Sequence, residues 1–425
     1  MQRKAFHDLV RSGRIFLDGG SGTWLQSHGM PSGVCPEAWA LDHPDLPAAM
    51  CREYFTHGAN IVVTFTFGAN EIKLAHYGFS VSAVESLNAR LSRIAVDVRD
   101  AVAGSTGNPL FVSGDIGPTG RFLTPAGDLE MSRLVEIYRR QVRGLLAGGV
   151  DLFSIETMLD LGQTLAALRA VRLECDLPVI ATLTFDASGR TLSGNSPLEC
   201  SVALESAGAD AIGANCSSGP EAMGTLLKDL AGRTLLPIVI KPNAGMPRME
   251  DGKTVFDMTP AAFADAMLPL VRQGVGQLVG GCCGTTPEHI SALCAAVGDA
   301  RPEPAVPSGP PVAVMICSAR RSAVAPAAGA ITYLPADDPE TLQDTVMDAM
   351  ADDPEVIGLC FRDSAPKDTV ALVEAVGWVQ AVCPVPLVFR SEDAVLLEAL
   401  TAAYPGRAGI VTRSSGDFHW ALKLE

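Results

Sequence analysis

Three cysteines are the residues whose type and spacing most directly suggest chemistry in this sequence. Cys282 and Cys283 are adjacent in the segment GGCCG, and Cys216 lies upstream in NCSSGP. Three thiolates are soft ligands that suit zinc, and three protein ligands leave a fourth tetrahedral position open for a substrate. A substrate thiol bound at such a position loses its proton and becomes nucleophilic. The pattern therefore predicts a zinc ion that prepares a thiol for S-alkylation rather than for hydrolysis.

Adjacent cysteines can bind one metal ion only where the backbone is irregular, because neighbouring side chains on a regular strand point to opposite faces. Gly280, Gly281 and Gly284 surround the pair and permit a close approach of the backbone. Two inert, buried cysteines are the alternative interpretation. The glycines and the third cysteine favour the metal site.

The elements that must position these cysteines are eight short apolar runs. Each run is continuous rather than alternating, as expected of strands that are covered on both faces. Segments with apolar residues at helical spacing separate the runs, so the repeating unit is βα. Eight such units favour a closed (β/α)8 TIM barrel over an open doubly wound sheet. The runs are residues 14–20, 60–67, 109–117, 151–157, 178–185, 211–217, 236–245 and 277–284.

Functional groups of such a barrel lie at the C-terminal ends of its strands and in the loops that follow. Cys216 ends the sixth run, whereas Cys282 and Cys283 end the eighth. We therefore expect the three thiols to converge over one rim of the barrel.

The composition changes after residue 300. Residues 301–311, RPEPAVPSGPP, hold five prolines in eleven positions, which predicts a stiff linker between a barrel at 1–300 and a second domain at 312–425. Four strand-like and three helix-like runs in the second domain predict a smaller α/β domain that resembles half of a second barrel. Uncovered parallel strands are unfavourable, so we expect this half barrel to pack on the first domain or on another subunit as a homodimer.

The bulk composition excludes several classes of partner. A formal net charge of -16 argues against nucleic acid and against an anionic membrane surface. No apolar run reaches the roughly 20 residues that cross a bilayer, and the N-terminus lacks the pattern of a secretory signal. We therefore expect a cytoplasmic enzyme whose eleven cysteines are reduced thiols or metal ligands.

Five segments resemble the homocysteine S-methyltransferase family, and the resemblance extends from residue 1 to about residue 300. It is closest to the homocysteine-binding module of cobalamin-dependent methionine synthases. The resemblance implies methionine biosynthesis, with zinc on Cys216, Cys282 and Cys283 and homocysteine as the thiol. The segments are LDGGSGTWLQ (17–26), VTFTFGAN (63–70), NCSSGP (215–220), KPNAG (241–245) and GGCCGTTPEHI (280–290).

The resemblance also implies which residues bind the substrate. Asp18 and Glu156 would receive the ammonium group of homocysteine, as two carboxylates that face a cation. Gly19 and Thr64 would hold its amino-acid end. Asn215 would orient the zinc site without binding the metal.

Three further polar residues are less clearly assigned. Lys241 and Asn243, at the end of the seventh run, are interpreted either as substrate contacts or as turn residues. His289 is interpreted as an exposed or capping residue of the last barrel helix rather than as a ligand, because three thiolates already account for the metal.

The methyl donor varies within the family between methylcobalamin, betaine and a sulfonium compound such as S-methylmethionine. Betaine-using members carry an aromatic residue where this chain has Gly68, so the segment resembles the methionine synthase branch. Residues 386–407 resemble the early part of the pterin-binding barrel of that branch, which implies a truncated pterin-binding-like domain. Residues 390–393 depart from the acidic pattern of a folate site, so we do not expect folate to bind.

No cobalamin-binding DxHxxG stretch is present, so a methylcorrinoid would arrive on a separate protein. The leading hypothesis is therefore a zinc-dependent homocysteine S-methyltransferase with a protein-bound methylcorrinoid as donor. One alternative is a small-molecule donor, S-methylmethionine or betaine. An alternative of another class is a non-catalytic scaffold that binds zinc or thiols.

Overall fold

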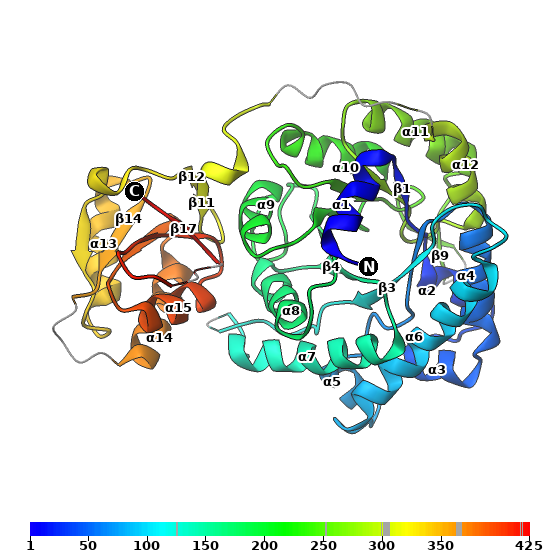
Figure 1. Cartoon of the computed structure of the whole chain (residues 1–425), viewed down its shortest axis with the longest axis horizontal. Coiled ribbons are helices and arrows are strands. Elements are labelled where there is room, and N and C mark those ends of the chain that lie inside the picture. Colours follow the sequence, from blue (N-terminus) through cyan, green and yellow to red (C-terminus); the bar gives the residue numbers. More distant parts are fainter. Residues whose placement is uncertain are drawn as a thin grey trace.

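The computed structural model describes residues 1–124, 126–250, 253–298, 300, 307–362, 368–416, 418 and 420–425. These residues form a large barrel and, beside it, a smaller α/β domain (Figure 1). The predicted fold class is confirmed.

Eight parallel strands form the barrel in the order β1-β10-β7-β6-β5-β4-β3-β2 among the described residues. A bridge between Leu17 and Ile61 joins the two ends of this order, so the sheet nearly closes on itself. Seven of the eight predicted runs contain one of these strands, and the fourth run, 151–157, covers all of β4 except its last residue, Met158. The strands are β1 (Ile15–Phe16), β2 (Ile61–Val63), β3 (Phe111–Ile116), β4 (Leu152–Met158), β5 (Val179–Leu183), β6 (Ala211–Asn215), β7 (Ile238–Lys241) and β10 (Leu278–Val279).

The helices surround the barrel, and their starts follow local capping chemistry. Asp160 accepts a hydrogen bond from the N–H of Gln163 at 2.7 Å, which starts α8. Thr259 caps α11 in the same way ahead of Pro260. The helices are α1 (Arg3–Ser12), α2 (Ser21–Ser27), α3 (Pro36–Asp42), α4 (Asp45–Thr56), α5 (Glu71–Ala75), α6 (Ala83–Val102), α7 (Met131–Gly148), α8 (Leu161–Glu174), α9 (Pro197–Ser206), α10 (Pro220–Leu227), α11 and α12 (Pro260–Arg272 and Pro287–Val297).

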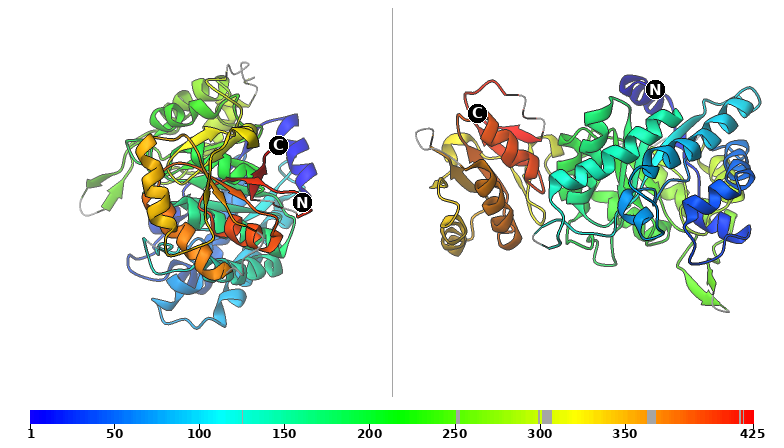
Figure 2. Two further views of the ribbon diagram at one scale, coloured as in Figure 1. Left: turned by 90° about the vertical axis from the view of Figure 1, so that its left-hand side faces the viewer. Right: turned by 90° about the horizontal axis from the view of Figure 1, so that it is seen from below.

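The two ends of the barrel differ. At the N-terminal end, Phe6 and Val10 of α1 pack on Ile15, Leu17 and other apolar side chains of the strand starts. At the opposite end, the hairpin of β8 (Arg248–Glu250) and β9 (Lys253–Val255) projects away from α1 (Figure 2). The C-terminal end of the strands is therefore the end left for chemistry.

The second domain contains a five-stranded parallel sheet in the order β13-β14-β15-β16-β17. Its apolar core includes Leu359, Phe389, Leu397 and Tyr404, all nearly inaccessible to solvent. The domain therefore has a core of its own. Its elements are β13 (Tyr333–Pro335), β14 (Ile357–Cys360), β15 (Leu387–Arg390), β16 (Ala408–Val411), β17 (Ala421–Lys423), α13 (Leu342–Ala349), α14 (Thr369–Val382) and α15 (Ala394–Ala403).

One predicted strand of this domain lies outside its main sheet. The run at 312–317 contains β11 (Met315–Cys317), which pairs antiparallel with β12 (Ser322–Val324). The turn between them is closed by Ser318, whose Oγ accepts from the N–H groups of Arg320 and Arg321, both at 3.0 Å. This local turn sends the chain back on itself. The main sheet takes its first and last strands from β13 and β17 instead, which the sequence interpretation did not include.

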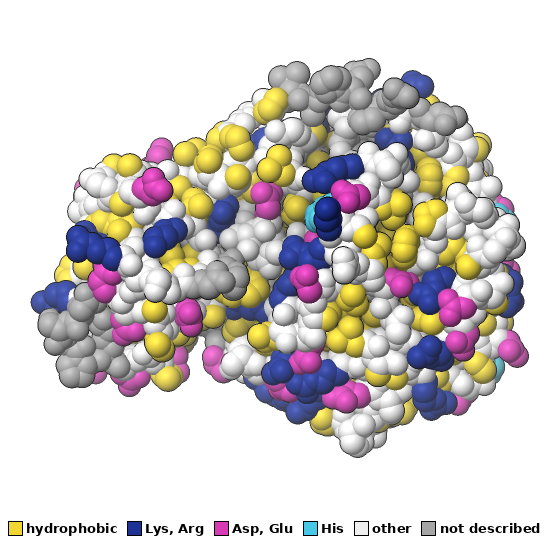
Figure 3. Space-filling view, in the orientation of Figure 1, with side chains coloured by type: hydrophobic (Ala, Val, Ile, Leu, Met, Phe, Trp, Pro, Cys, Tyr) yellow, Lys and Arg dark blue, Asp and Glu magenta, His cyan; other side chains and the backbone are white. Residues whose placement is uncertain are grey.

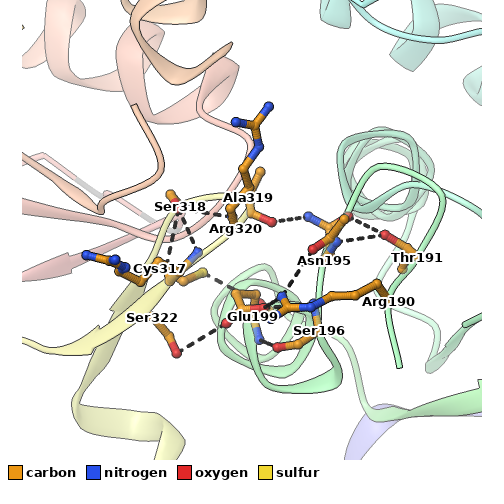
Figure 4. Close-up of polar contacts among 12 residues, drawn as sticks. Arg190, Thr191, Asn195, Ser196, Glu199, Cys317, Ser318, Ala319, Arg320 and Ser322 are labelled. Atoms are coloured by element: carbon orange, nitrogen blue, oxygen red, sulfur yellow. Dashed lines mark hydrogen bonds and ion pairs between the residues drawn. The ribbon is translucent and has the colours of Figure 1, made fainter. Parts of the chain in front are cut away.

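The second domain packs against α8 and α9 of the barrel. Figure 4 shows the β11–β12 turn facing the loop before α9, where the amide of Asn195 donates to the carbonyl of Ala319. Cys317 donates to the carbonyl of Glu199 at 3.5 Å. The guanidinium of Arg169 lies 4.5 Å from the ring centroid of Trp420. One predicted mode of packing, onto the first domain, is thus present.

No helix in the described part of the chain has the length and apolarity needed to span a bilayer. On the face that carries α1, acidic and basic side chains are interspersed with apolar ones rather than separated by sign (Figure 3).

Candidate active site

The structure brings the three predicted cysteines together at the C-terminal end of the barrel. The sulfur atoms of Cys216, Cys282 and Cys283 all lie within 4.8 Å of one another. The Sγ atoms of Cys216 and Cys283 are 4.0 Å apart. All three residues are partly buried. Three converging sulfur donors fit a zinc ion that keeps one coordination position for a substrate.

Cys216 reaches this cluster through a strained backbone. It follows the last residue of β6 and has φ 63, and Ser217 has φ 61. A non-glycine residue in this left-handed region costs about 1–3 kcal/mol, so the surroundings must hold it. The N–H of Cys216 donates to the carbonyl of Lys241 at 3.1 Å, and the N–H of Ser218 donates to the carbonyl of Cys216 at 2.7 Å. Backbone strain of this kind clusters at functional sites, and here it occurs where three sulfur atoms converge.

Cys282 and Cys283 lie beyond the end of β10, where the backbone is irregular as predicted. The N–H of Cys282 donates to the carbonyl of Pro242 at 2.8 Å, and the N–H of Ala244 donates to the carbonyl of Cys283 at 3.0 Å. Gly284 has φ 79. A Cβ atom at Gly281 would lie 2.2 Å from Oγ1 of Thr285, so this position needs glycine.

The three thiols influence one another strongly. Hydrogen bonds from Cys282 and Cys283 lower the pKa of Cys216 to about 3. The hydrogen bond to Cys216 is in turn the main cause that raises the pKa of Cys283 to about 12 and the pKa of Cys282 well above its ordinary value. Without a cation the cluster therefore favours one thiolate and two thiols. A divalent cation is what would hold three thiolates at this spacing.

A pair of carboxylates lies at the same end of the barrel, joined by a buried lysine. The Nζ atom of Lys241 is 3.2 Å from Oδ1 of Asp18 and 3.0 Å from Oε2 of Glu156. The second oxygen of Asp18 accepts from the N–H of Val63 at 2.7 Å. Burial raises the pKa of Asp18, with Lys241 acting in the opposite direction. Burial opposes the charge of Lys241, but Glu156 and Asp18 outweigh it and raise the pKa of the lysine.

Glu156, which reaches Nζ of Lys241, lies where β4 is irregular. The register between β4 and β5 shifts between Ile155 and Met158, and Thr157 has φ 57. A bulge of this kind changes the direction of a side chain. Asn215 holds the bulge in place. Its Oδ1 accepts from the N–H of Thr157 at 2.7 Å, and its Nδ2 donates to Oγ1 of Thr157 at 2.8 Å. Nδ2 of Asn215 also lies 3.7 Å from Sγ of Cys282. Asn215 therefore contacts both the sulfur cluster and the bulge beside Glu156.

Gly19 and Thr64 lie beside the carboxylates. A Cβ atom at Gly19 would be 2.6 Å from Oγ1 of Thr285, which requires the absence of a side chain. The hydroxyl of Thr64 accepts from the N–H of Asp115 at 2.9 Å and is 2.7 Å from the hydroxyl of Thr66. Since Thr66 donates its own proton to the carbonyl of Asp115, Thr64 is the donor of that pair. Its hydroxyl proton is thus already used within the protein.

The comparisons with known proteins agree with this geometry. The homocysteine S-methyltransferase family model matches residues 15–297. The chain belongs to the homocysteine S-methyltransferase family.

Relatives in this family cover different parts of the chain. Methionine synthase of Mycobacterium tuberculosis is 31% identical over 437 aligned positions, which cover 96% of this chain and 36% of that protein. Methionine synthase of Mycobacterium leprae is 32% identical over 293 positions, which cover 66% of this chain and 24% of that protein. The chain thus spans about a third or less of the length of these relatives.

A solved structure of a homocysteine methyltransferase is similar to a large part of this chain. The homocysteine methyltransferase MmuM from Escherichia coli, in its metallated form, has a TM-score of 0.58 and 25% identity, and the match covers 69% of this chain and 98% of that one. The oxidized form of the same protein has a TM-score of 0.55. The three cysteines of this chain are consistent with zinc, and this relative has been solved in a metallated form.

The family motif KPNAG contributes more than a turn. Lys241 binds both carboxylates. Asn243 is buried, and its side chain contributes a hydrogen bond that lowers the pKa of Cys216, after the larger effects of the other two cysteines. His289 caps α12, because its Nδ1 accepts from the N–H of Thr286 at 3.1 Å, but it is buried rather than exposed. Its Nε2 lies 2.9 Å from the carbonyl of Met258, which explains the burial.

Sequence reasoning missed one acidic residue of the site. Asp115, at the end of β3, is buried and interacts electrostatically with Glu156, Lys241 and Asp18. The rule that located Cys216, a polar residue at the C-terminal end of a barrel strand, applies to Asp115 as well. That rule could have found it.

Proposed function

We propose that this chain is a zinc-dependent homocysteine S-methyltransferase that forms methionine. The observation that carries the proposal is the side chain of Asn215, which contacts Cys282 of the sulfur cluster and the bulge that orients Glu156. The sulfur cluster and Glu156 thus lie next to each other, which supports a substrate that carries both a thiol and an ammonium group. Family membership supports homocysteine as that substrate.

In this proposal Cys216, Cys282 and Cys283 hold the zinc ion, which when bound lowers the pKa of the substrate thiol. Asp18 and Glu156 bind the α-ammonium group by charge-assisted hydrogen bonds. Gly19 leaves room for the amino-acid end, and Asn215 keeps Cys282 and Glu156 in register. The protein groups therefore fix the position of the sulfur relative to an incoming methyl group.

The proposed reaction is a methyl transfer to sulfur. The thiol gives up its proton, and the sulfur forms a bond to the methyl carbon of the donor. The bond between that carbon and the donor breaks, and its electron pair stays on the donor. The product is the thioether methionine.

We propose a methylcorrinoid bound to a separate protein as the donor. The similarity to a methionine synthase over 96% of the chain supports this branch, since it includes the second domain. The chemistry around Gly68 argues against betaine. A Cβ atom at Gly68 would lie 2.7 Å from Oε1 of Glu37, so a larger residue does not fit. The ring of Phe67 already has Nζ of Lys73 at 4.9 Å from its centroid, where a quaternary ammonium would otherwise bind.

A small-molecule donor such as S-methylmethionine is the second candidate, because 98% of the E. coli homocysteine methyltransferase aligns with only 69% of this chain, so that protein lacks a counterpart to the rest. The division into a barrel at 1–300, a linker at 301–311 and a domain at 312–425 stays a proposal. Residues 301–306 lie outside the described residues. The cytoplasmic location, the homodimer and the truncated pterin-binding character of the second domain stay predictions.

The experiment that tests the proposal combines metal analysis with a donor screen. Protein purified without chelator should contain about one zinc ion per chain. Zinc-loaded protein is then incubated with homocysteine and, in separate reactions, free methylcobalamin, S-methylmethionine, betaine or methyltetrahydrofolate, and methionine is measured. Methionine from methylcobalamin alone supports the proposal, and methionine from S-methylmethionine identifies the second candidate. Zinc binding without methionine from any donor would favour the scaffold hypothesis.

A further inference from the structure

Asp115 carries a buried carboxyl group. Its strand, β3, lies in the barrel between β2, which precedes Thr64, and β4, which contains Glu156, and Asp115 is next to the end of β3. The side chain is 4% exposed. Its Oδ1 atom has no hydrogen-bond partner among the described residues. A buried carboxyl oxygen without a partner is costly, so its presence at this position calls for an explanation.

The backbone of Asp115 is held firmly. Its N–H donates to the hydroxyl of Thr64 at 2.9 Å, and its carbonyl accepts from the hydroxyl of Thr66 at 2.8 Å. Gln141 donates to the carbonyl of Thr66 at 2.8 Å. Side chains that follow β2, and one from α7, thus fix the position from which the carboxyl group projects. The carboxyl oxygen Oδ1 of Asp115 therefore lacks a partner in the described part of the chain even though the backbone that carries it is well held.

The charges around Asp115 are unbalanced. Asp18, Asp115 and Glu156 interact electrostatically with one another and with Lys241. Glu37 and Lys73 also interact with Asp115, so four carboxyl groups face two ammonium groups, those of Lys241 and Lys73. Burial, followed by the charge of Glu156, raises the pKa of Asp115 well above its ordinary value. A further cation, such as the ammonium group of a substrate, would reduce this imbalance.

The hydrogen-bond inventory also favours a further acceptor in this pocket. An ammonium group has three N–H donors. Lys241 uses Oδ1 of Asp18 and Oε2 of Glu156, the same two carboxyl groups proposed to bind the substrate. When a substrate ammonium group enters, two cations with six donors compete for these two carboxylates. One acceptor position of Asp18 is already taken by the N–H of Val63, so a third carboxyl group adds both acceptors and negative charge for the second cation.

We propose that Asp115 is the third carboxyl group of the amino-group pocket, so that Asp18, Asp115 and Glu156 together hold two ammonium groups, that of Lys241 and that of the amino-acid substrate. This inference rests on the proposed function. Asp115 thereby makes the site selective for a thiol that carries an amino group. The unpartnered Oδ1 atom of Asp115 accepts a hydrogen bond from the ammonium group of the substrate. If the substrate displaces Lys241, the same oxygen accepts from Lys241 instead.

The test compares homocysteine with 4-sulfanylbutanoate, which has the same thiol and carboxylate but no amino group. Binding of each compound to the zinc-loaded full chain is measured by calorimetry for the native protein, Asp115→Ala and Asp115→Asn. We expect Asp115→Ala to bind homocysteine about tenfold more weakly or worse, since it loses a hydrogen bond to a charged group. Asp115→Asn keeps an acceptor and is expected to lose less. The affinity for 4-sulfanylbutanoate should stay within about twofold in both variants.

A control variant and a second measurement separate this role from a structural one. Ser113→Ala, on the same strand, removes a buried hydrogen bond to Ser154 and should leave the ratio of the two affinities unchanged. In the absence of ligand, Asp115→Asn should unfold at a higher temperature than the native protein, because an unpartnered buried carboxyl group is removed.

The outcomes distinguish the inference from the proposed function. Homocysteine binding within twofold of native in Asp115→Ala, or an equal loss for both compounds, overturns the role of Asp115 alone. A lower unfolding temperature together with equal losses identifies Asp115 as a structural residue and also overturns it. Failure of the native, zinc-loaded protein to bind homocysteine overturns the proposed function and this inference with it.

Discussion

Asn215 and Thr157 are joined by two hydrogen bonds, from the N–H of Thr157 to Oδ1 of Asn215 at 2.7 Å and from Nδ2 of Asn215 to Oγ1 of Thr157 at 2.8 Å. The pair includes Thr157, which has a left-handed backbone beside Glu156, and Asn215 directly precedes Cys216, which has one as well. The same amide group contacts Sγ of Cys282. The geometry of the sulfur cluster and the direction of Glu156 are therefore coupled through one side chain.

Asn215→Asp tests this coupling. The substitution keeps the acceptor for Thr157 but removes the donor to Cys282 and places a negative charge beside the thiolates. We expect zinc affinity to fall about 10–100-fold, as for other groups that support metal ligands. Competition with a chromogenic chelator measures the affinity. Thr182→Val is the control, because Thr182 donates to Asn215 at 2.8 Å without contacting a cysteine. Equal zinc affinity in Asn215→Asp and the native protein would contradict the prediction.

Cys283→Ala removes one of the three sulfur donors. Two remaining thiolates bind zinc much more weakly than three, so we expect loss of bound zinc after dialysis and loss of methionine formation. Elemental analysis and the methyl-transfer assay measure the two effects. Cys360→Ser, in β14 of the second domain, should keep full zinc content. A Cys283→Ala protein with native zinc content and activity would exclude the proposed metal site.

Zinc removal should expose one unusually acidic thiol. The pKa of Cys216 lies near 3, because Cys282 and Cys283 donate hydrogen bonds to its sulfur. A lowered pKa means that the thiolate persists at pH values well below the ordinary 9.0. In metal-free protein at pH 6, iodoacetamide should therefore modify Cys216 before Cys282 and Cys283. Peptide mass spectrometry over time gives the order, and faster modification of Cys283 would show that the proton is distributed differently.

Lys241→Met leaves Asp18 and Glu156 without their buried cation. Breaking a buried ion pair from one side costs about 3–5 kcal/mol, so we expect a large loss in the free energy of unfolding at neutral pH. Burial raises the pKa of Asp18, which means that the folded chain holds this proton more tightly than the unfolded chain. The loss should therefore grow as the pH rises from about 4 and shrink in acid.

Urea unfolding of Lys241→Met at several pH values measures this dependence. Lys228→Met changes an exposed lysine in the short helical turn Lys228–Leu230 and should alter stability by no more than about 0.5 kcal/mol. A pH-independent loss in Lys241→Met would argue against the carboxylates as its cause.

Gly68→Ala tests why no larger residue follows Phe67. The added Cβ atom would lie 2.7 Å from Oε1 of Glu37, a carboxylate that also accepts from the N–H of Gly68 at 2.6 Å. We expect a destabilisation of about 1–3 kcal/mol from overpacking, and no betaine-dependent activity. Gly13→Ala is the matched control, because nothing lies within 4 Å of its added Cβ atom. Equal stability of the two variants would show that the region around Glu37 yields easily.

Much of the fold and the cluster of three cysteines could be predicted from the sequence because both depend on local patterns. Continuous apolar runs predict buried parallel strands wherever they occur, and the place of Cys216, Cys282 and Cys283 at strand ends requires only the geometry of a barrel. Paired glycines around Cys282 and Cys283 likewise predict irregular backbone from neighbouring residues alone.

Only the tertiary structure decided which polar groups meet. Lys241 lies 223 positions from Asp18 and 85 from Glu156, and nothing near it in the sequence indicates that it neutralises both. The tertiary structure alone also shows that His289 is buried, that the hydroxyl of Thr64 is hydrogen-bonded and that the carboxyl group of Asp115 has an oxygen unpartnered among the described residues. A hydrogen bond or an ion pair depends on positions to within a few tenths of an ångström, and those positions are set only when the strands close into one barrel.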